Sequence, residues 1–274
     1  HSPEGGKEAL QAALVPFSMG SDHQVYTDSS FGIPAVYLND WPDRYIHTNF
    51  DTPANVDPTK LKRAAFIGAA SADFLANVTA EDAGSLWRVV RARSLARTSL
   101  ALARRDALPS DEADALARFH LWHERALFDS FGRFFRIPEP LRAEASAFLD
   151  QEALLFRQTG AARGVVGARE SAADGRLVFR RNADIKGTMS AFGYDYFTDK
   201  YGAERAGKLR LLGFAGARGS GGEYAYEVLN FADGRRDARE IRDMVSAVYG
   251  PVPLELVVEY LRALEEIGVV KLAR

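Results

Sequence analysis

Residues 20–61 read GSDHQVYTDSSFGIPAVYLNDWPDRYIHTNFDTPANVDPTKL, and this stretch decides the fold expected for the beginning of the chain. Its apolar run at 33–38 follows a glycine and predicts a short buried strand. The loop after that strand would lie at the edge where open α/β sheets bind ligands. Further along, Asp57 suits an N-cap and Pro58 the first helical position, so a helix is expected over 58–78.

Two polar residues of this loop indicate possible metal chemistry. His47 carries an imidazole, the commonest metal ligand among side chains. Asp51 follows it closely, and a ligating histidine usually donates its other ring N–H to a carboxylate or a carbonyl. The alternative for His47 is a structural loop histidine. For His23, packing near the start of a helix is favoured over metal ligation.

Four motifs occur in order along this stretch, and together they are more specific than any one alone. They are Ser21-Asp22-His23, Gly32-Ile33-Pro34, His47-Thr48 with Asp51-Thr52, and Asp57-Pro58. In this combination residues 1–78 resemble the C-terminal end of the catalytic domain in the co-catalytic zinc aminopeptidase family. That family also includes glutamate carboxypeptidase II and the glutaminyl cyclases.

The resemblance implies a role for four residues. His47 matches the last zinc ligand of the family, while Ser21, Asp22 and Asp51 would lie behind the ligands and line the same site. In the complete enzyme two zinc ions would polarise the scissile carbonyl and activate a bridging water, while a glutamate takes its proton. The family's other ligands and this glutamate precede the Ser-Asp-His turn. No His-x-Asp or Glu-Glu pair stands there, so no catalytic residue is assigned in this chain and the zinc site is expected to be partial.

Composition excludes several classes of protein. The 274 residues, 47% of them hydrophobic, are enough for roughly two domains. A net charge of -2 gives no basic field for nucleic acid, and the absence of cysteine excludes disulfides and thiolate metal sites. No apolar run approaches the ~20 residues of a membrane span. Because the chain starts at His1 inside a recognisable domain, a fragment is expected; its location would be periplasmic or secreted if a preceding segment carried a signal peptide.

The expected fold class is an α/β fragment, the end of a zinc-exopeptidase α/β/α domain, followed by a mostly α region and a small winged-helix-like α+β module. The expected boundaries are 1–79 for the peptidase-like part, 80–172 for the helical region, 173–221 for a linker or small α+β segment, and 222–274 for the last module. A loop is expected over 160–175, where Gly, Ala and Arg are frequent.

Three antiparallel helices are expected in the helical region, with breaks at Pro109-Ser110-Asp111, where Ser110 or Asp111 would be the N-cap, and at 137–140. The first is rich in arginine, and a solvated face balanced by acidic neighbours is favoured over nucleic-acid binding. His120 and His123 could share a metal at i, i+3, but packing is favoured. The helical region could also mediate a homodimer.

The final module resembles a small winged-helix unit, with helices expected near 224–231, 239–249 and 253–267 and a strand at 269–272. A tight turn is expected at 232–236, where Gly234 can take a positive φ. A further strand is expected at 177–179. Such folds often bind DNA, but no concentrated basic patch is present, so docking on the helical region is expected.

These patterns predict the C-terminal portion of a zinc-dependent aminopeptidase-like hydrolase that cleaves N-terminal residues from peptides and is inactive without the upstream half. One alternative is a non-catalytic interaction protein that retains a decayed peptidase segment. A second alternative is an acyltransferase of the glutaminyl cyclase type.

Overall fold

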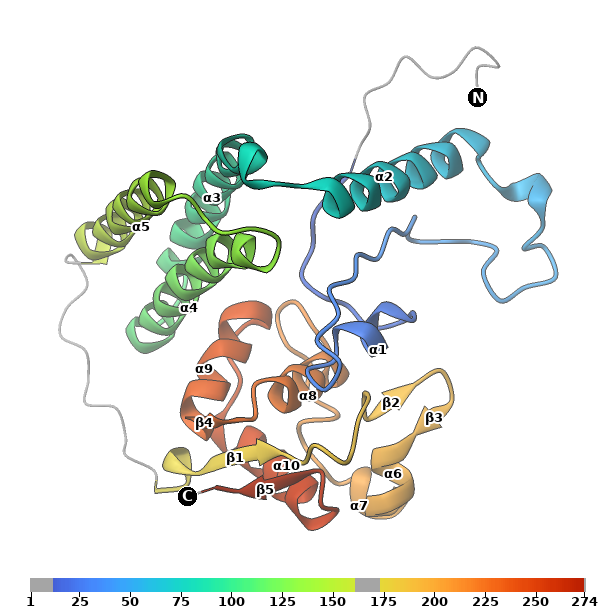
Figure 1. Ribbon diagram of the computed structural model, residues 1–274. Coiled ribbons are helices and arrows are strands. Elements are labelled where there is room, and N and C mark those ends of the chain that lie inside the picture. Colours follow the sequence, from blue (N-terminus) through green and yellow to red (C-terminus); the bar gives the residue numbers. More distant parts are fainter. Residues whose placement is uncertain (1–11, 161–172, 274) are drawn as a thin grey trace.

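The computed structural model describes residues 12–160 and 173–273 (Figure 1). The helices and 3-10 turns, in chain order, are α1 (His23–Thr27), η1 (Pro53–Asn55), α2 (Pro58–Asn77), η2 (Ala80–Asp82), α3 (Ala83–Asp106), α4 (Ser110–Asp129), η3 (Ser130–Arg133), α5 (Glu139–Gly160), η4 (Ala173–Arg176), α6 (Tyr196–Tyr201), α7 (Ala203–Ala206), α8 (Gly221–Asn230), α9 (Ala238–Tyr249) and α10 (Leu254–Glu266). The strands are β1 (Val178–Arg181), β2 (Ser190–Ala191), β3 (Tyr194–Asp195), β4 (Asp233–Asp237) and β5 (Val270–Leu272). The expected mixture of α and β structure is confirmed at this coarse level. Most of the loop expected over 160–175 lies outside the described residues.

Helix α2 begins where its capping residues predict. The Asp57 carboxylate accepts hydrogen bonds from the backbone N–H groups of Thr59 (2.9 Å) and Lys60 (3.3 Å), and Pro58 occupies the first turn. These contacts satisfy two of the donors that a helix start leaves without partners. No residue of α2 is buried, and Phe66 is 72% exposed. Figure 1 shows α2 reaching away from the C-terminal half of the chain.

The prediction of a strand at 33–38 is wrong. The run is extended but belongs to no strand, and its side chains are exposed, with Val36 at 81%. A strand is stable when neighbouring strands pair with its backbone and a packed layer covers its side chains. The part of the chain that the structure describes supplies neither to this run.

Helices α3, α4 and α5 confirm the three helices expected in the helical region. Their shared core contains Trp87, whose ring packs edge-on against Phe128 (centroids 5.3 Å apart) and Phe148 (5.5 Å). The breaks fall at the predicted prolines, because α4 follows Pro109 and α5 begins at Glu139. The N-cap of α4 is Pro109 and not Ser110 or Asp111, so that detail of the prediction is corrected.

The C-terminal part combines α8, α9 and α10 with an antiparallel sheet of order β4-β1-β5. Its core is continuous, and the rings of Tyr224, Tyr249 and Tyr260 are among its largest fully buried side chains. The three predicted helices are confirmed with small shifts at their ends. The predicted turn at 232–236 is strand β4, in which Gly234 has the expected positive φ of 81°.

Strand β1 lies in the middle of this sheet, with β4 on one side and β5 on the other (Figure 1). It comes from the 173–221 segment, so the sheet extends beyond the 222–274 range expected for the module. No single helix among the described residues has the length and apolarity to span a membrane; α9 and α10 reach these criteria only when taken together as a bent pair.

The C-terminal part docks on the helical region, as expected, through α9 and α4. Ion pairs bridge the contact: Arg242 with Glu112, and Arg118 with Asp243 at 3.0 Å. Arg104 of α3 also donates to the backbone carbonyl of Ala247, in the last turn of α9. Hydrogen bonds and ion pairs between polar groups therefore form part of this contact.

Candidate functional site

His47 lies in an exposed turn with an unusual backbone. Its φ is 61°, in the left-handed region that residues other than glycine rarely adopt. The turn is held on both sides, because the backbone N–H of Tyr45 donates to the Asp43 carboxylate (2.8 Å) and the hydroxyl of Thr48 donates to the Tyr45 carbonyl (2.6 Å). Backbone conformations of this kind gather at functional sites, where surrounding contacts maintain them.

Asp51 belongs to the same exposed loop. Its backbone N–H donates to the carbonyl of Thr48 at 3.2 Å, so it follows His47 at the end of one short turn. The sequence therefore placed both residues correctly in one loop. No hydrogen bond between the Asp51 carboxylate and the His47 imidazole is found within the described ranges 12–160 and 173–273.

Ser21 and Asp22 lie elsewhere, at the start of α1. Their carbonyls accept from the N–H groups of Gln24 (3.2 Å) and Val25 (3.0 Å), and the Asp22 side chain makes no capping hydrogen bond. His23, the next residue, has its Nε2 2.8 Å from the Ser18 carbonyl, and its ring stacks on Tyr37 with centroids 4.5 Å apart. These contacts favour the packing role over a ligand role for His23.

The predicted site residues thus form two groups. His47 and Asp51 share one loop, and Ser21 and Asp22 share the turn before α1. Within the described part of the chain no hydrogen bond or ion pair joins the two groups, and no cluster of three or more His, Asp or Glu side chains is placed to hold a metal ion. Zinc sites take three or four protein ligands. A zinc ion would therefore need ligands in addition to His47.

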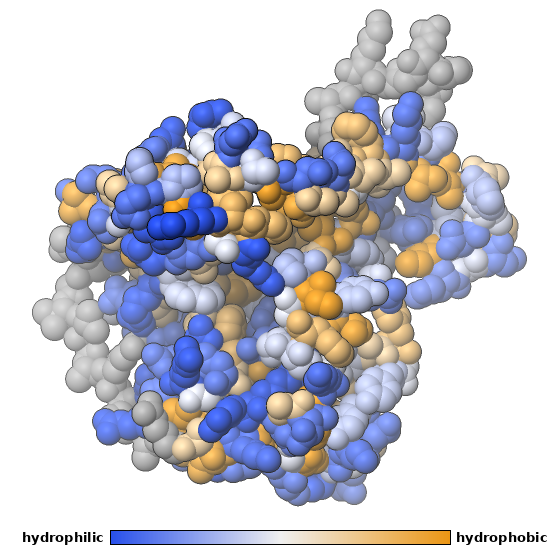
Figure 2. All heavy atoms as spheres, viewed as in Figure 1, coloured by the Kyte–Doolittle hydropathy of each residue, from blue (hydrophilic) through white to orange (hydrophobic). Residues whose placement is uncertain are grey.

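Many large apolar side chains between residues 31 and 75 are exposed. They include Phe31, Ile33, Val36, Leu38, Trp41, Phe50, Val56, Leu61, Phe66, Phe74 and Leu75. Figure 2 shows apolar residues distributed among polar ones over this part of the molecule, at the upper right. Contiguous apolar surface of more than a few hundred Å² marks interaction sites in soluble proteins.

A second polar cluster lies in the core of the helical region. The Glu124 carboxylate is buried and accepts two hydrogen bonds from Arg97, at 2.6 Å from Nε and 2.7 Å from Nη2. Thr98 donates to the buried Glu152 at 2.7 Å, and its oxygen lies 2.8 Å from Nε2 of His120. The cluster therefore ties α3, α4 and α5 together through hydrogen bonds.

Burial shifts the protonation of this cluster in opposite directions. It lowers the pKa of His120 to about 4, so the ring is neutral at pH 7, and it raises the pKa of Glu152. Burial alone would also raise the pKa of Glu124, but hydrogen bonds from Arg97, His123 and Ser94 outweigh it and hold that pKa well below its usual range. The sequence suggested packing for His120, and packing with hydrogen bonding is what the structure shows.

Two arginines of α3 pair with carboxylates of the neighbouring helices. Arg97 binds Glu124 of α4, and Arg91 binds Glu144 of α5 at 2.8 Å.

No protein-family model, no curated protein and no solved structure matches this chain.

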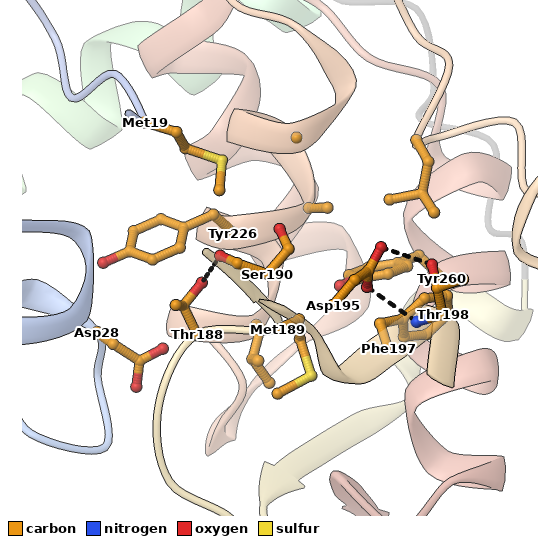
Figure 3. A pocket seen from close by; sticks show the side chains of 14 residues that line it. Met19, Asp28, Thr188, Met189, Ser190, Asp195, Phe197, Thr198, Tyr226 and Tyr260 are labelled. Atoms are coloured by element: carbon orange, nitrogen blue, oxygen red, sulfur yellow. Dashed lines mark hydrogen bonds between the residues drawn. The ribbon is translucent and has the colours of Figure 1, made fainter. Parts of the chain in front are cut away.

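Two adjoining cavities lie between residues 17–30, the N-terminal segment, and the C-terminal part. Met19, Ser190 and Asp195 line both, and Figure 3 shows the more enclosed one with Asp28 and Tyr226 at its edge. The polar groups have partners, since the Asp195 carboxylate accepts from the N–H (2.9 Å) and the hydroxyl (2.6 Å) of Thr198. Beside these cavities the side-chain amide of Gln24 donates to the carbonyl of Ser190 at 2.9 Å, a contact between the N-terminal segment and the C-terminal part. The sequence alone did not predict this contact, because the two residues that form it are more than 150 positions apart.

Proposed function

We propose that this chain contributes the C-terminal portion of a zinc-dependent, aminopeptidase-like hydrolase, in which His47 is one zinc ligand. The observation that carries the proposal is the left-handed turn at His47, which hydrogen bonds on both sides maintain, in a stretch of chain whose apolar side chains are exposed. The peptide substrate and the reaction at the N-terminal residue follow from the resemblance of residues 1–78.

The exposed apolar surface supports the proposal that a further layer of secondary structure packs on this part of the chain. Helix α2 has a well-capped start and 20 residues, but none of them is buried. Helices in proteins gain most of their stability from packing an apolar face, and the run at 33–38 needs neighbouring strands in the same way. An α/β layer supplied by another stretch of polypeptide would cover both and would bring the remaining zinc ligands to His47.

The chain's own residues would then have separate roles. His47 would bind zinc through its neutral imidazole, and Asp51, which follows it in the turn, would orient the ring by accepting its other N–H. Asp22 and Ser21 would line the site. When bound, zinc would polarise the scissile carbonyl and activate the attacking water.

The test uses the complete product of the gene that encodes this chain. We expect it to bind zinc and to hydrolyse aminoacyl p-nitroanilides, and we expect His47→Ala to abolish hydrolysis and remove about one zinc per protein, because a zinc ion holds poorly with one of its few ligands removed. His123→Gln, a change outside the segment, is the matched control and should alter neither. Full zinc occupancy in His47→Ala would refute the ligand assignment.

The non-catalytic interaction protein is the second candidate, favoured by the single ligand that the described residues offer. A complete gene product that neither binds zinc nor hydrolyses these substrates would support this candidate and overturn the hydrolase proposal. Assays on peptides with N-terminal glutamine would separate hydrolysis from cyclisation.

A further inference from the structure

The wider of the two adjoining cavities is a groove between the N-terminal segment and the hairpin formed by β2 and β3. Its volume is about 390 Å³, within the range of small-molecule sites in proteins. The side chains of Met19, Phe192 and Tyr194 line it. The groove adjoins the enclosed cavity of Figure 3, whose volume is about 70 Å³. Together they offer room for the body of a small ligand and for one end group.

The walls of the groove are fixed by contacts between the two parts of the chain. The buried side chain of Gln24 donates to the carbonyl of Ser190 (2.9 Å), and the hydroxyl of Tyr226 donates to the carbonyl of Gln24 (2.8 Å). Further along, Asp28 and Arg181 form an ion pair at 2.8 Å, with side chains 1% and 10% exposed. The groove is therefore formed before any ligand arrives, as most small-molecule sites are.

Asp195 lines both cavities and carries a negative charge into them. One of its carboxylate oxygens accepts from the N–H of Thr198 (2.9 Å) and the other from the Thr198 hydroxyl (2.6 Å), as Figure 3 shows. Each oxygen has a second lone pair with which it can accept a further hydrogen bond. Its N-cap position on α6 supplies only the partial positive charge of a helix start.

No positively charged side chain balances this carboxylate. The residues that line the two cavities include no Lys, Arg or His, and Asp195 forms no ion pair within residues 12–160 and 173–273. An anionic ligand would therefore meet a negative charge there and no positive partner. A positively charged ligand would find the complementary charge at the place where the two cavities meet.

The hairpin carries a large ring at a position that the backbone reserves for other residues. Phe192 and Gly193 connect β2 to β3, with φ of 41° and 81°. Two positive φ values define a type I′ turn, whose usual sequence is Asn-Gly, and a bulky side chain there is unfavourable. Phe192 is 65% exposed and lines the groove. Hairpin formation does not account for this ring, whereas contact with a ligand in the groove does.

We propose that this groove binds a small organic cation, whose protonated amine pairs with Asp195 and whose flat apolar body packs against Phe192 and Tyr194. Aromatic faces attract cations, and the apolar contact adds hydrophobic stabilisation. A bare metal ion does not fit, since the described residues hold no group of three or more His, Asp or Glu for it. The proposal is independent of the hydrolase function, because His47 lines neither cavity.

The first measurement is a titration of the 274-residue chain followed by ¹H–¹⁵N NMR, with three probes of similar shape. Phenethylamine is cationic at pH 7, 2-phenylethanol is neutral and 3-phenylpropionate is anionic. We expect phenethylamine to shift the amides of 190–196 with a Kd of about 1 mM or below, as suits a ligand of its size, and the other two to bind about tenfold more weakly or less. Equal binding of the amine and the alcohol, or no shift in 190–196, would overturn the proposal.

The second measurement removes the charge. Asp195→Asn keeps an oxygen that can cap α6, so it should fold, but it should raise the Kd of phenethylamine about tenfold and abolish the preference over 2-phenylethanol. Asp199→Asn is the matched control, because Asp199 is an exposed residue of the same helix and lines neither cavity. Its Kd should change less than about twofold. Equal weakening in both variants would assign the effect to overall charge and overturn the proposal.

The third measurement separates binding from folding. Phe192→Gly removes the ring and suits the positive φ, so the thermal unfolding temperature should not fall. The Kd of phenethylamine should nevertheless rise about threefold or more, because the aromatic contact is lost. If Asp195→Asn does not fold, this variant and the comparison of amine with alcohol decide the question. An unchanged Kd in Phe192→Gly would overturn the proposed site.

Discussion

The most consequential single residues of the helical region are those that neutralise its buried carboxylates. Glu124 is 1% exposed at its side chain, and Arg97 supplies its charged partner. Removing one member of a buried pair leaves an uncompensated charge, which is more destabilising than exchanging both for apolar residues.

We expect Arg97→Met to lower the free energy of unfolding at pH 7 by about 3 kcal/mol, the lower end for such pairs because Arg97 is 34% exposed. The double variant Arg97→Met with Glu124→Gln should recover part of this loss. The control Arg88→Met, at an exposed residue of the same helix, should change the free energy of unfolding little. Urea denaturation measures all three. Equal stability of Arg97→Met and the unmodified chain would show that the pair is not stabilising.

His120 makes stability depend on pH. Its folded pKa of about 4 lies below its usual 6.5, so the unfolded chain binds more protons between these values. Its contribution is therefore fully present above about pH 6.5 and is lost as pH falls towards about 4. We expect His120→Gln to flatten the stability profile over this window, measured by urea denaturation at several pH values. An unchanged slope between pH 6.5 and 4 would contradict the burial of the neutral ring.

Among the elements, α2 shows how a correct local pattern can lack tertiary support. Asp57 and Pro58 define its start, yet its apolar residues stay exposed. The run at 33–38 shows the same effect for a strand.

We expect Phe66→Ser to change the stability of the 274-residue chain by no more than about 0.5 kcal/mol, as for surface substitutions generally. In the complete gene product the same substitution should reduce the stability of the protein several-fold more, because there the Phe66 side chain would be covered. Thermal unfolding of both proteins measures the contrast. A large loss of stability in the 274-residue chain would show that Phe66 is already packed.

At the scale of the whole molecule, the C-terminal part is a shared support. It holds the helical region through α9 and α4, and the N-terminal segment through Arg181 and Tyr226. It is thus not an appendage attached by a flexible tether. Dimerisation through the helical region stays a prediction.

We expect truncation after residue 221 to leave an insoluble or unfolded product, since β1 would lose both partner strands and α4 would lose α9. Circular dichroism and size-exclusion chromatography of the truncated chain test this. A soluble truncated protein with cooperative unfolding would contradict the shared-support role.

The sequence by itself determined the features that depend on neighbours along the chain. Asp57 and Pro58 predicted the start of α2, the prolines at 109 and 138 predicted the breaks between helices, and Gly234 predicted a positive φ. Capping, ring constraints and glycine freedom are local, so a few residues decide them.

Only the tertiary structure decided which segments meet. The central place of β1, the Asp28–Arg181 pair and the cluster of Glu124, Glu152 and His120 each join residues far apart in sequence. From an apolar run or a charged residue in the sequence one can infer that it needs a partner, but not which residue that partner is. Burial and partner choice depend on the packing of the whole chain, which is why 33–38 predicted a strand and is exposed here.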